Sequence, residues 1–246
     1  MSRLTQLRVA ILINSPPGNE FWNDVRESYY AAFRVVAPDA QVDMYDPVFQ
    51  RNYSNPHEYD LIVLSGGKAD ASSSEPWVLG VLEFLRTTAR ESPKTKLLGI
   101  CWGHQAISRA FGGEIRPVPT GPVAGVEDIK LTEAGKKFFA CGPGSISYRL
   151  PEFHVREVAK PGLNFISLAE NHEMFVNLDN TILSFQSHPE VQPALAKKML
   201  LEEDDVYNGN LSPKELESHL KKLEQQTDGF VVLSRMIQWV GEGDTL

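Results

Sequence analysis

Hydrophobic residues in the first half of the chain form short runs, separated by longer segments in which apolar positions recur with helical spacing. A short, continuous apolar run predicts a strand that is buried on both faces of a parallel sheet. Such runs occupy residues 8–14, 59–64 and 96–100. Residues 41–45 alternate between polar and apolar positions, which also predicts a strand. Helical spacing predicts helices over residues 19–36, 77–89 and 102–111. This alternation predicts an α/β fold, with a mainly parallel, open sheet covered by helices on both faces.

The second half of the chain has shorter segments and a different pattern. Strands are predicted over residues 113–118, 125–131, 145–148, 164–168, 174–178 and 181–186. They indicate a small antiparallel portion beside the parallel sheet. Helices are predicted over residues 191–201, 213–226 and 229–240. The length of 246 residues suits one domain, residues 1–246, of which residues 205–246 form a helical C-terminal extension.

Local signals refine two of these predictions. Ser72 and Glu75 resemble a capping box, and Pro76 suits the first turn of the helix that follows. Asp179 and Asn180 fit a tight hairpin turn between the last two strands.

Composition excludes several classes of partner. The formal net charge is −8 and no dense block of lysine and arginine occurs, which argues against a nucleic-acid partner. No apolar stretch reaches membrane-spanning length or has the form of a secretion signal, so we expect a cytoplasmic protein with no membrane association. The two cysteines, Cys101 and Cys141, are then expected to be free thiols. The six histidines are scattered, and we expect no metal site.

Cys101 lies in the most informative stretch of the sequence. The predicted strand 96–100 leads directly into the cysteine. Gly99 lies two residues before it, and Gly103 lies two residues after it, at the start of a predicted helix. Two glycines at this spacing allow a sharp strand-to-helix turn from which the central side chain projects. The N-terminus of a helix favours thiolate over thiol. Cys101 is therefore a candidate nucleophile, and the alternative is a small buried cysteine of purely structural role.

His188 and Glu190 are candidate partners for this cysteine. His188 follows a predicted strand, and ligand sites in open parallel sheets lie beyond the carboxyl ends of strands. Residues i and i+2 of an extended segment share one face, so the Glu190 carboxylate can orient the His188 ring. Gly66 and Gly67, after another strand, are candidate backbone donors to an oxyanion. The alternatives are a solvated loop for the His-Pro-Glu segment and a simple turn for the glycines.

Three segments in this order, residues 65–67, 99–105 and 187–190, resemble the class I, triad-type glutamine amidotransferases. The resemblance covers roughly residues 8–201 and implies a flavodoxin-like fold. It implies that Cys101 attacks a γ-glutamyl amide, that His188 serves as general acid and base, and that Glu190 orients His188. A thioester forms in such enzymes, an amine or ammonia leaves, and water then releases glutamate. No cofactor is implied.

The same resemblance assigns residues around the nucleophile. It implies oxyanion donors at Gly67 and Trp102, with Gly66 close by, and a substrate contact from Gln105. Trp102 stands where relatives commonly have smaller or phenolic residues, so its indole is expected either to narrow the pocket or to form part of its wall.

Other segments resemble one branch of this family. Residues 65–77, 112–115 and 153–158 resemble the amidotransferase domain of GMP synthetase, related stand-alone fungal proteins and the plant γ-glutamyl peptidases. This resemblance implies that His154 lines the substrate pocket, whereas an exposed loop or strand histidine is the alternative.

Three functions remain open from the sequence. The chain either cleaves γ-glutamyl amides or peptides alone, or supplies ammonia as the glutaminase component of a separate synthetase partner. A non-catalytic binding protein on the same fold is the third. In the first two cases the bound small molecule is a γ-glutamyl compound.

Overall fold

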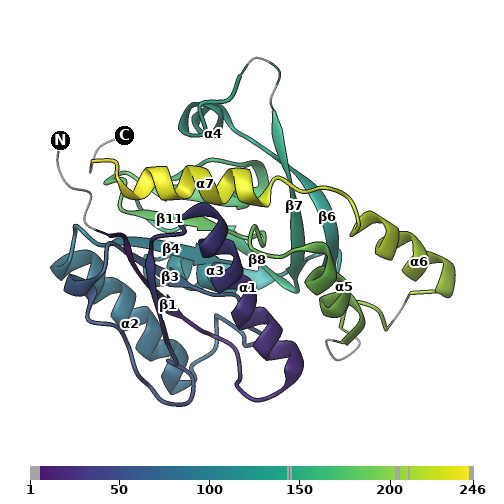
Figure 1. The fold of residues 1–246 in the computed structure, drawn as a ribbon, viewed down its shortest axis with the longest axis horizontal. Coiled ribbons are helices and arrows are strands. Elements are labelled where there is room, and N and C mark those ends of the chain that lie inside the picture. Colours follow the sequence, from purple (N-terminus) through teal and green to yellow (C-terminus); the bar gives the residue numbers. More distant parts are fainter. Residues whose placement is uncertain (1–5, 143, 145, 203–205, 210, 244–246) are drawn as a thin grey trace.

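A seven-stranded sheet forms the centre of the structure, a computed structural model that describes residues 6–142, 144, 146–202, 206–209 and 211–243. Its strand order is β2-β1-β3-β4-β11-β10-β9 (Figure 1). These strands are β1 (Arg8–Leu12), β2 (Gln41–Tyr45), β3 (Leu61–Leu64), β4 (Lys96–Ile100), β9 (Phe165–Ser167), β10 (Met174–Asn177) and β11 (Ile182–Phe185). Strands β2, β1, β3, β4 and β11 are mutually parallel, whereas β10 and β9 are antiparallel to their neighbours.

Two small antiparallel pairs flank this sheet. Strand β5 (Glu114–Pro117) pairs with β8 (Arg156–Lys160), and β6 (Val123–Lys130) pairs with β7 (Ser147–His154). The mainly parallel sheet and the antiparallel portion confirm the predicted fold class. Strand β7 is longer than the predicted segment 145–148, in which residue 145 lies outside the described residues, because β6 pairs with it along eight positions.

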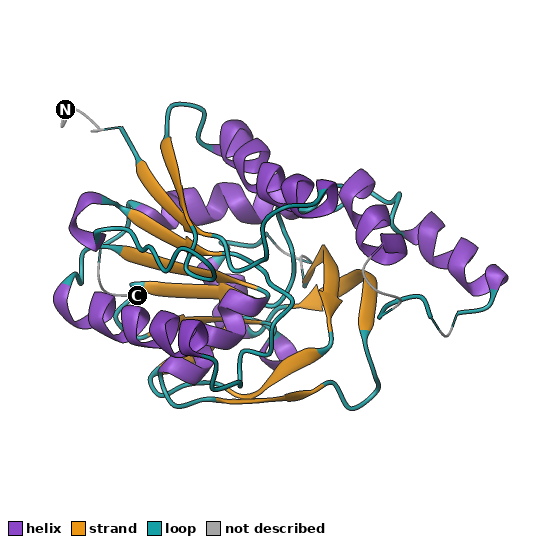
Figure 2. Ribbon diagram, turned by 90° about the horizontal axis from the view of Figure 1, so that it is seen from below, coloured by secondary structure: helices purple, strands orange, loops and turns teal. Residues whose placement is uncertain are grey.

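Helices cover both faces of the sheet (Figure 2). They are α1 (Glu20–Val36), α2 (Pro76–Glu91), α3 (Trp102–Ala110), α4 (Glu133–Phe138), α5 (Pro193–Glu202), α6 (Pro213–Lys222) and α7 (Gly229–Val240), with short 3-10 turns at Pro56–Glu58 and Glu170–His172. Side chains alternate along β1: Val9 and Ile11 pack into the cluster that contains α1 and α7, and Ala10 and Leu12 pack into the cluster that contains α2 and α3. A strand between two helical layers must be apolar on both faces, which explains the continuous apolar runs.

The start of α2 differs from the prediction in one detail. Pro76 is the first helical residue, as expected, but Glu75 occupies the N-cap position and caps no backbone N–H with its side chain. Its carboxylate instead accepts a hydrogen bond from Trp77 Nε1 at 2.8 Å, while Ser72 bonds to Asp70. The predicted capping box is therefore wrong, because both of its side chains have other partners.

Helix α7, near the C-terminal end, packs into the main core. Trp239 has no exposed surface, and its indole N–H donates to Asn180 Oδ1 at 2.7 Å. Val232, Leu233 and Met236 of the same helix are also buried. Helix α6 lies at the periphery and has no buried residue (Figure 1). Within the predicted extension 205–246, residues 205, 210 and 244–246 lie outside the described residues. We propose that residues 1–246 form one domain, because α7 completes its core.

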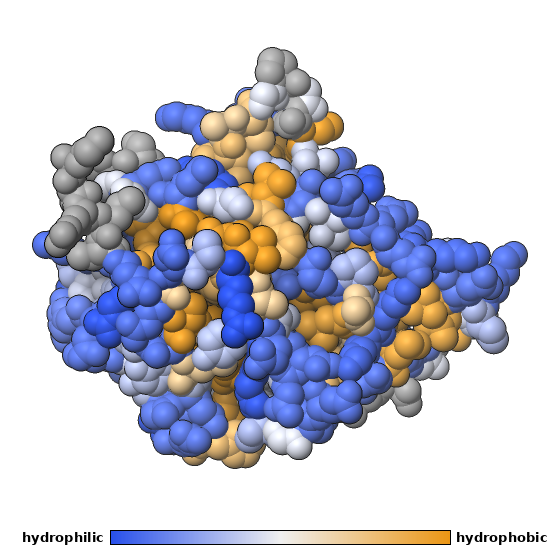
Figure 3. All heavy atoms as spheres, viewed as in Figure 1, coloured by the Kyte–Doolittle hydropathy of each residue, from blue (hydrophilic) through white to orange (hydrophobic). Residues whose placement is uncertain are grey.

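Hydrophilic side chains predominate on the face seen in Figure 3. Hydrophobic side chains are visible on this face around α7, where Val231 is exposed. Within the described residues, no helix is both long and apolar enough to cross a membrane.

Replacing Trp239 tests whether α7 belongs to the core. Trp239→Ala is expected to lower the free energy of unfolding by about 3–5 kcal/mol, because it removes a large buried side chain. Val231→Ala, an exposed position of the same helix, is the control and should change it by no more than about 0.5 kcal/mol. Urea unfolding measures both; equal stabilities of the two variants would contradict a core role for α7.

Candidate active site

Cys101 occupies a sharp turn between β4 and α3. Its backbone angles are φ 52° and ψ −103°, a conformation that residues other than glycine rarely adopt. Neighbouring glycines make room for this turn. A Cβ on Gly99 would lie 2.6 Å from the carbonyl group of Gly103, and a Cβ on Gly103 would lie 2.4 Å from the carbonyl oxygen of Leu64. The turn that the glycine spacing predicts is therefore present, and it depends on close backbone approach at both glycines.

Strand β11 brings His188 and Glu190 to the same edge of the sheet as Cys101. It pairs in parallel with β4, with Phe185 opposite Ile100, so the loops after both strands emerge side by side. His188 Nδ1 lies 2.8 Å from Glu190 Oε1. The backbone N–H of His188 donates to the carbonyl of Pro151 at 2.8 Å, which fixes the loop against β7.

The His188 ring and the Cys101 side chain converge on Gly66, at the end of β3. A Cβ on Gly66 would lie 2.9 Å from His188 Cε1 and 3.7 Å from Cys101 Cβ. All three residues line one small cavity of about 40 Å³. Cys101 Sγ also lies 3.6 Å from the carbonyl oxygen of Phe153, on β7. Four segments that are distant in the sequence therefore meet around one sulfur atom.

Two neighbouring groups determine the charge state of His188. Burial opposes a charged ring, but the electrostatic effects of Cys101 and then Glu190 raise the pKa of His188 well above its ordinary value. The raised pKa favours the protonated form of the ring. An imidazolium beside a cysteine favours the thiolate form of the sulfur.

The backbone N–H groups around this sulfur differ in whether they already have a hydrogen-bond partner. The Gly66 N–H donates to the Tyr29 hydroxyl at 2.9 Å, so it already has a partner. Gly67 borders the cavity of Cys101 and packs tightly, because a Cβ there would lie 2.2 Å from the Asn14 carbonyl oxygen. Trp102 is the first residue of α3, and the first N–H groups of a helix have no partner within it.

The indole of Trp102 lies in the core, which corrects the expectation that it narrows the pocket or forms its wall. It is 1% exposed and stacks on Trp77, with ring centroids 5.0 Å apart and an interplanar angle of 26°. Trp77 comes from α2, so this packing joins α2 to the start of α3.

A second cavity, of about 160 Å³, opens beside Cys101. It is lined by Gly67, Lys68, Ala69, Cys101, Gln105, Phe153, His154, Val155, Arg156, Val206 and Tyr207. The Gln105 amide donates to the carbonyl of Arg156 at 2.8 Å and to Gln186 Oε1 at 3.2 Å. Arg156 forms an ion pair with Asp70 at 2.8 Å. The structure thus brings Gly67, Gln105 and His154 together with Cys101, as the sequence predicts.

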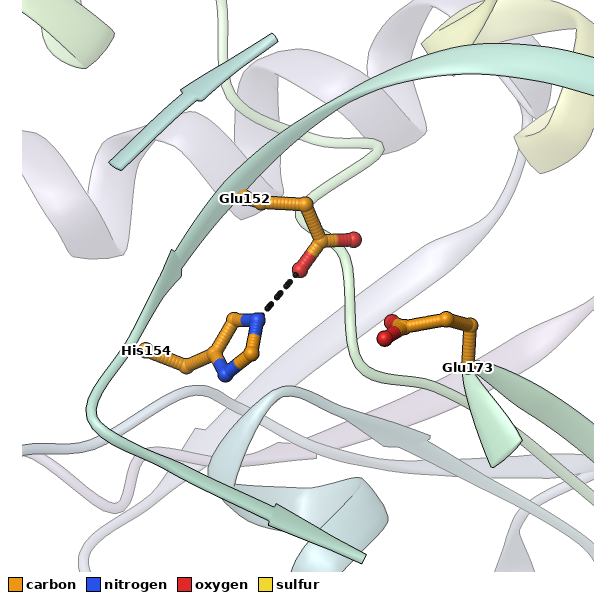
Figure 4. A group of neighbouring side chains, drawn as sticks. All are labelled: Glu152, His154 and Glu173. Atoms are coloured by element: carbon orange, nitrogen blue, oxygen red, sulfur yellow. Dashed lines mark ion pairs between the residues drawn. The ribbon is translucent and has the colours of Figure 1, made fainter. Parts of the chain in front are cut away.

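The His154 ring makes other contacts. Its Nδ1 lies 3.0 Å from the carbonyl oxygen of Arg156, and its Nε2 lies 3.0 Å from Glu152 Oε2. Among the described residues, Glu152, His154 and Glu173 form a group whose ligand atoms lie within 4.8 Å of one another (Figure 4). The sequence analysis missed this group, although the i, i+2 spacing of Glu152 and His154 places them on one face of a strand.

Tyr29 is another residue at the site that the sequence analysis missed. Burial and then the Glu190 carboxylate raise its pKa well above the ordinary value, so its hydroxyl stays neutral. Tyr29 lies within the apolar periodicity of α1, and that periodicity alone marks it only as a core residue.

Comparisons with known proteins identify the family of the chain. The sequence profile described as "Glutamine amidotransferase class-I" matches residues 22–206. The chain is 50% identical to the glutamine amidotransferase-like protein chyE of Penicillium rubens, over 98% of this chain and 100% of that protein. It is 27% identical to gamma-glutamyl peptidase 2 of Arabidopsis thaliana, over 94% and 95% of the two chains. It is 30% identical to a glutamine-hydrolyzing GMP synthase subunit from Sulfurisphaera tokodaii, over 55% of this chain and 69% of that protein.

A solved structure shows the same fold. The crystal structure of a glutamine amidotransferase from Thermotoga maritima superposes with a TM-score of 0.71 over 97% of this chain and 100% of that one, at 20% identity.

Alkylation compares the reactivity of the two thiols. Iodoacetamide is expected to label Cys101 at least about tenfold faster than Cys141 near neutral pH, although Cys101 is the more buried. Peptide mass spectrometry measures both rates.

The variants Cys141→Ala and His188→Ala complete this experiment. Cys141→Ala should retain the fast reaction, and His188→Ala should slow it. Faster labelling of Cys141 in the unmodified protein would contradict activation of Cys101.

Proposed function

The chain belongs to the class I glutamine amidotransferase family, and from this premise we propose that it is an enzyme that cleaves γ-glutamyl amide or peptide bonds through a thioester on Cys101. The proposal rests on one observation above all. An oriented His188–Glu190 pair, 2.8 Å apart, shares a cavity with Cys101 at its strained turn. This arrangement has the nucleophile, the base and the orienting carboxylate that covalent catalysis by cysteine requires.

In the first half of the reaction, Cys101 Sγ attacks the γ-carbonyl carbon of the substrate. The proton of the thiol resides on His188, which donates it to the departing nitrogen as the C–N bond breaks. Glu190 holds the ring in orientation through Nδ1 and stabilises its positive charge. Ammonia or an amine leaves, and the γ-glutamyl group remains on the sulfur as a thioester.

In the second half, water attacks the thioester carbon while His188 accepts a proton from the water. The C–S bond then breaks, glutamate leaves, and the Cys101 thiolate is restored beside the protonated ring. Negative charge develops on the carbonyl oxygen in both halves. We assign its stabilisation to the backbone N–H groups of Gly67 and Trp102, because the N–H of Gly66 is already bonded to Tyr29.

The size of the cavity beside Cys101 fits a small substrate group. Its volume of about 160 Å³ lies below the about 300 Å³ at which pockets for drug-sized ligands begin, so it suits a single glutamyl group. Lys68 and Arg156 bring positive charge to its lining, which favours the α-carboxylate of that group. Glutamine, γ-glutamyl peptides and γ-glutamyl conjugates all share this group. The relative named gamma-glutamyl peptidase 2 supports peptides within this class.

A second candidate function is favoured by the similarity to a GMP synthase subunit. In this case the chain is a glutaminase that supplies ammonia to a separate synthetase partner. Its activity alone would be low and would rise when the partner binds. Full activity of the solitary, purified protein on glutamine or γ-glutamyl peptides would exclude this function.

Substitution of the proposed triad tests the mechanism. Cys101→Ala is expected to lower glutamate release by at least about 10⁴-fold, since the nucleophile is lost. His188→Ala should be nearly as damaging, and Glu190→Gln less so, because Glu190 acts through the ring. The assay measures glutamate released from glutamine, glutathione and γ-glutamyl dipeptides.

Cys141→Ala is the matched control for this series and should retain the rate of the unmodified protein. Unchanged turnover in Cys101→Ala would contradict the mechanism. Absence of turnover of every substrate by the unmodified protein, with Cys101 still open to alkylation, would favour a non-catalytic binding protein.

Replacing Arg156 tests the assignment of the substrate carboxylate. Arg156→Gln is expected to raise KM about tenfold with little change in kcat, because a charge-assisted bond to the substrate is lost. Asp70→Asn breaks the same ion pair but keeps the guanidinium, so its KM should change little. Equal effects of the two variants would mean that Arg156 acts only through its ion pair with Asp70.

A further inference from the structure

Glu152, His154 and Glu173 lie together (Figure 4). All three line a cavity that does not contain Cys101, although His154 also borders the cavity of Cys101. Glu152 and His154 belong to β7, and Glu173 directly precedes β10. Side chains alternate along a strand, so Glu152 and His154 lie on one face of β7. Phe153, between them, points to the opposite face, where it lines the cavity of Cys101. The group therefore lies next to the cavity of Cys101, which His154 also borders.

The bonding of His154 leaves one ring nitrogen available. A carbonyl oxygen only accepts hydrogen bonds, so the 3.0 Å contact with Arg156 O places a proton on Nδ1. In the neutral ring Nε2 then carries a lone pair. It lies 3.0 Å from Glu152 Oε2 without the geometry of a hydrogen bond. Two acceptors at this distance repel unless a proton or a cation neutralises them.

Three buried carboxylate oxygens of this group lack hydrogen-bond donors among the described residues. Glu152 is 2% exposed, and neither of its oxygens accepts a hydrogen bond from any described residue. The same holds for Glu173 Oε2. Buried polar groups without hydrogen-bond partners are rare and costly, so a bound cation would stabilise these carboxylates.

The surrounding cavity also favours a cation. Its volume is about 500 Å³, and its described lining contains one arginine and one lysine against six acidic residues. The acidic residues are Glu127, Asp128, Glu152, Glu157, Glu170 and Glu173. Arg116 already pairs with Glu157 at 2.7 Å. A concave surface with this excess of carboxylates concentrates cations.

We propose that Glu152, His154 and Glu173 bind a divalent transition-metal ion, for which Zn²⁺ is the best-suited probe. One imidazole nitrogen with two carboxylates is a donor set that zinc accepts, and the open cavity leaves a further coordination position for water. Two ligands about 2.1 Å from one ion lie about 3.0–3.4 Å apart, which the His154–Glu152 contact already matches. The bond from Nδ1 to a backbone carbonyl is the usual support of a metal-binding histidine.

Binding of the ion would cross-link two segments that contact the proposed catalytic residues. The ion joins β7, whose Phe153 carbonyl and Pro151 carbonyl contact Cys101 and His188, to Glu173. The carbonyl of Glu173 in turn accepts a hydrogen bond from the Gln186 N–H at 2.8 Å, in the segment that leads to His188. The bound metal would therefore connect β7 to the segment between Glu173 and His188, next to the proposed active site. This inference stands on its own contacts and does not depend on the proposed function.

Zinc binding to the full chain tests the proposal. The Cys101→Ala variant is used throughout, so that zinc has no reactive thiol to bind. Chelator-treated protein is titrated with ZnCl₂ by calorimetry, and bound metal is counted by elemental analysis after desalting. One zinc per chain is expected, with a rise in the thermal unfolding midpoint and much weaker binding of Mg²⁺.

Variants within the cavity assign the ligands. Glu173→Gln and Glu152→Gln are each expected to weaken zinc binding at least tenfold and to abolish the rise in the unfolding midpoint. Glutamine keeps the size of the side chain and removes a buried charge, so both variants should fold, as far-UV circular dichroism will verify. Glu170→Gln removes a carboxylate of the same cavity outside the group, and its affinity should stay within twofold of the parent.

Two results would overturn the proposal. One is the absence of zinc binding to the folded parent protein. The other is unchanged affinity in both Glu173→Gln and Glu152→Gln, which would place the zinc elsewhere.

Discussion

The backbone of Cys101 is held in a conformation with φ 52° that a residue with a side chain rarely adopts, and the rest of the site is arranged around it. Such strain persists only where the surroundings enforce it. Here Gly99 packs on Gly103, and Gly103 packs on the end of β3, at distances that leave no room for a Cβ. The same contact therefore bends the chain and brings the ends of β3 and β4 together. The sulfur is presented at the start of α3 as a result.

The parallel sheet explains why distant residues meet at this sulfur. Strands β3, β4 and β11 are parallel neighbours, so their carboxyl ends deliver Gly66, Cys101 and His188 to one edge. Strand β7 closes this edge from outside the sheet, where the Phe153 carbonyl approaches the sulfur. The same strand carries Glu152 and His154, and His154 borders both the cavity of Cys101 and that of the proposed metal site. Both therefore depend on how firmly β7 is held.

Local signals made the main features predictable. Apolar runs identified the central strands because strands between two helical layers bury side chains on both faces. The glycines around Cys101 identified its turn because the turn has no room for a Cβ at those positions. The pairing of His188 with Glu190 followed from their i, i+2 spacing. Features fixed by distant contacts were missed or wrong: β7 extends to His154 only because β6 pairs with it, and the Trp102 indole packs in the core because α2 supplies a partner ring. Glu173 joins His154 through the fold alone.

Direct detection of the acyl-enzyme tests the central claim. The unmodified protein would be mixed with γ-glutamyl substrates and quenched in acid during turnover, since thioesters survive at low pH, and its peptides would then be mapped by mass spectrometry. The account predicts a γ-glutamyl adduct on the peptide that contains Cys101, which disappears as the substrate is exhausted. Release of glutamate with the adduct on another residue, or with none on Cys101 even when deacylation is slowed by Glu190→Gln, would contradict it.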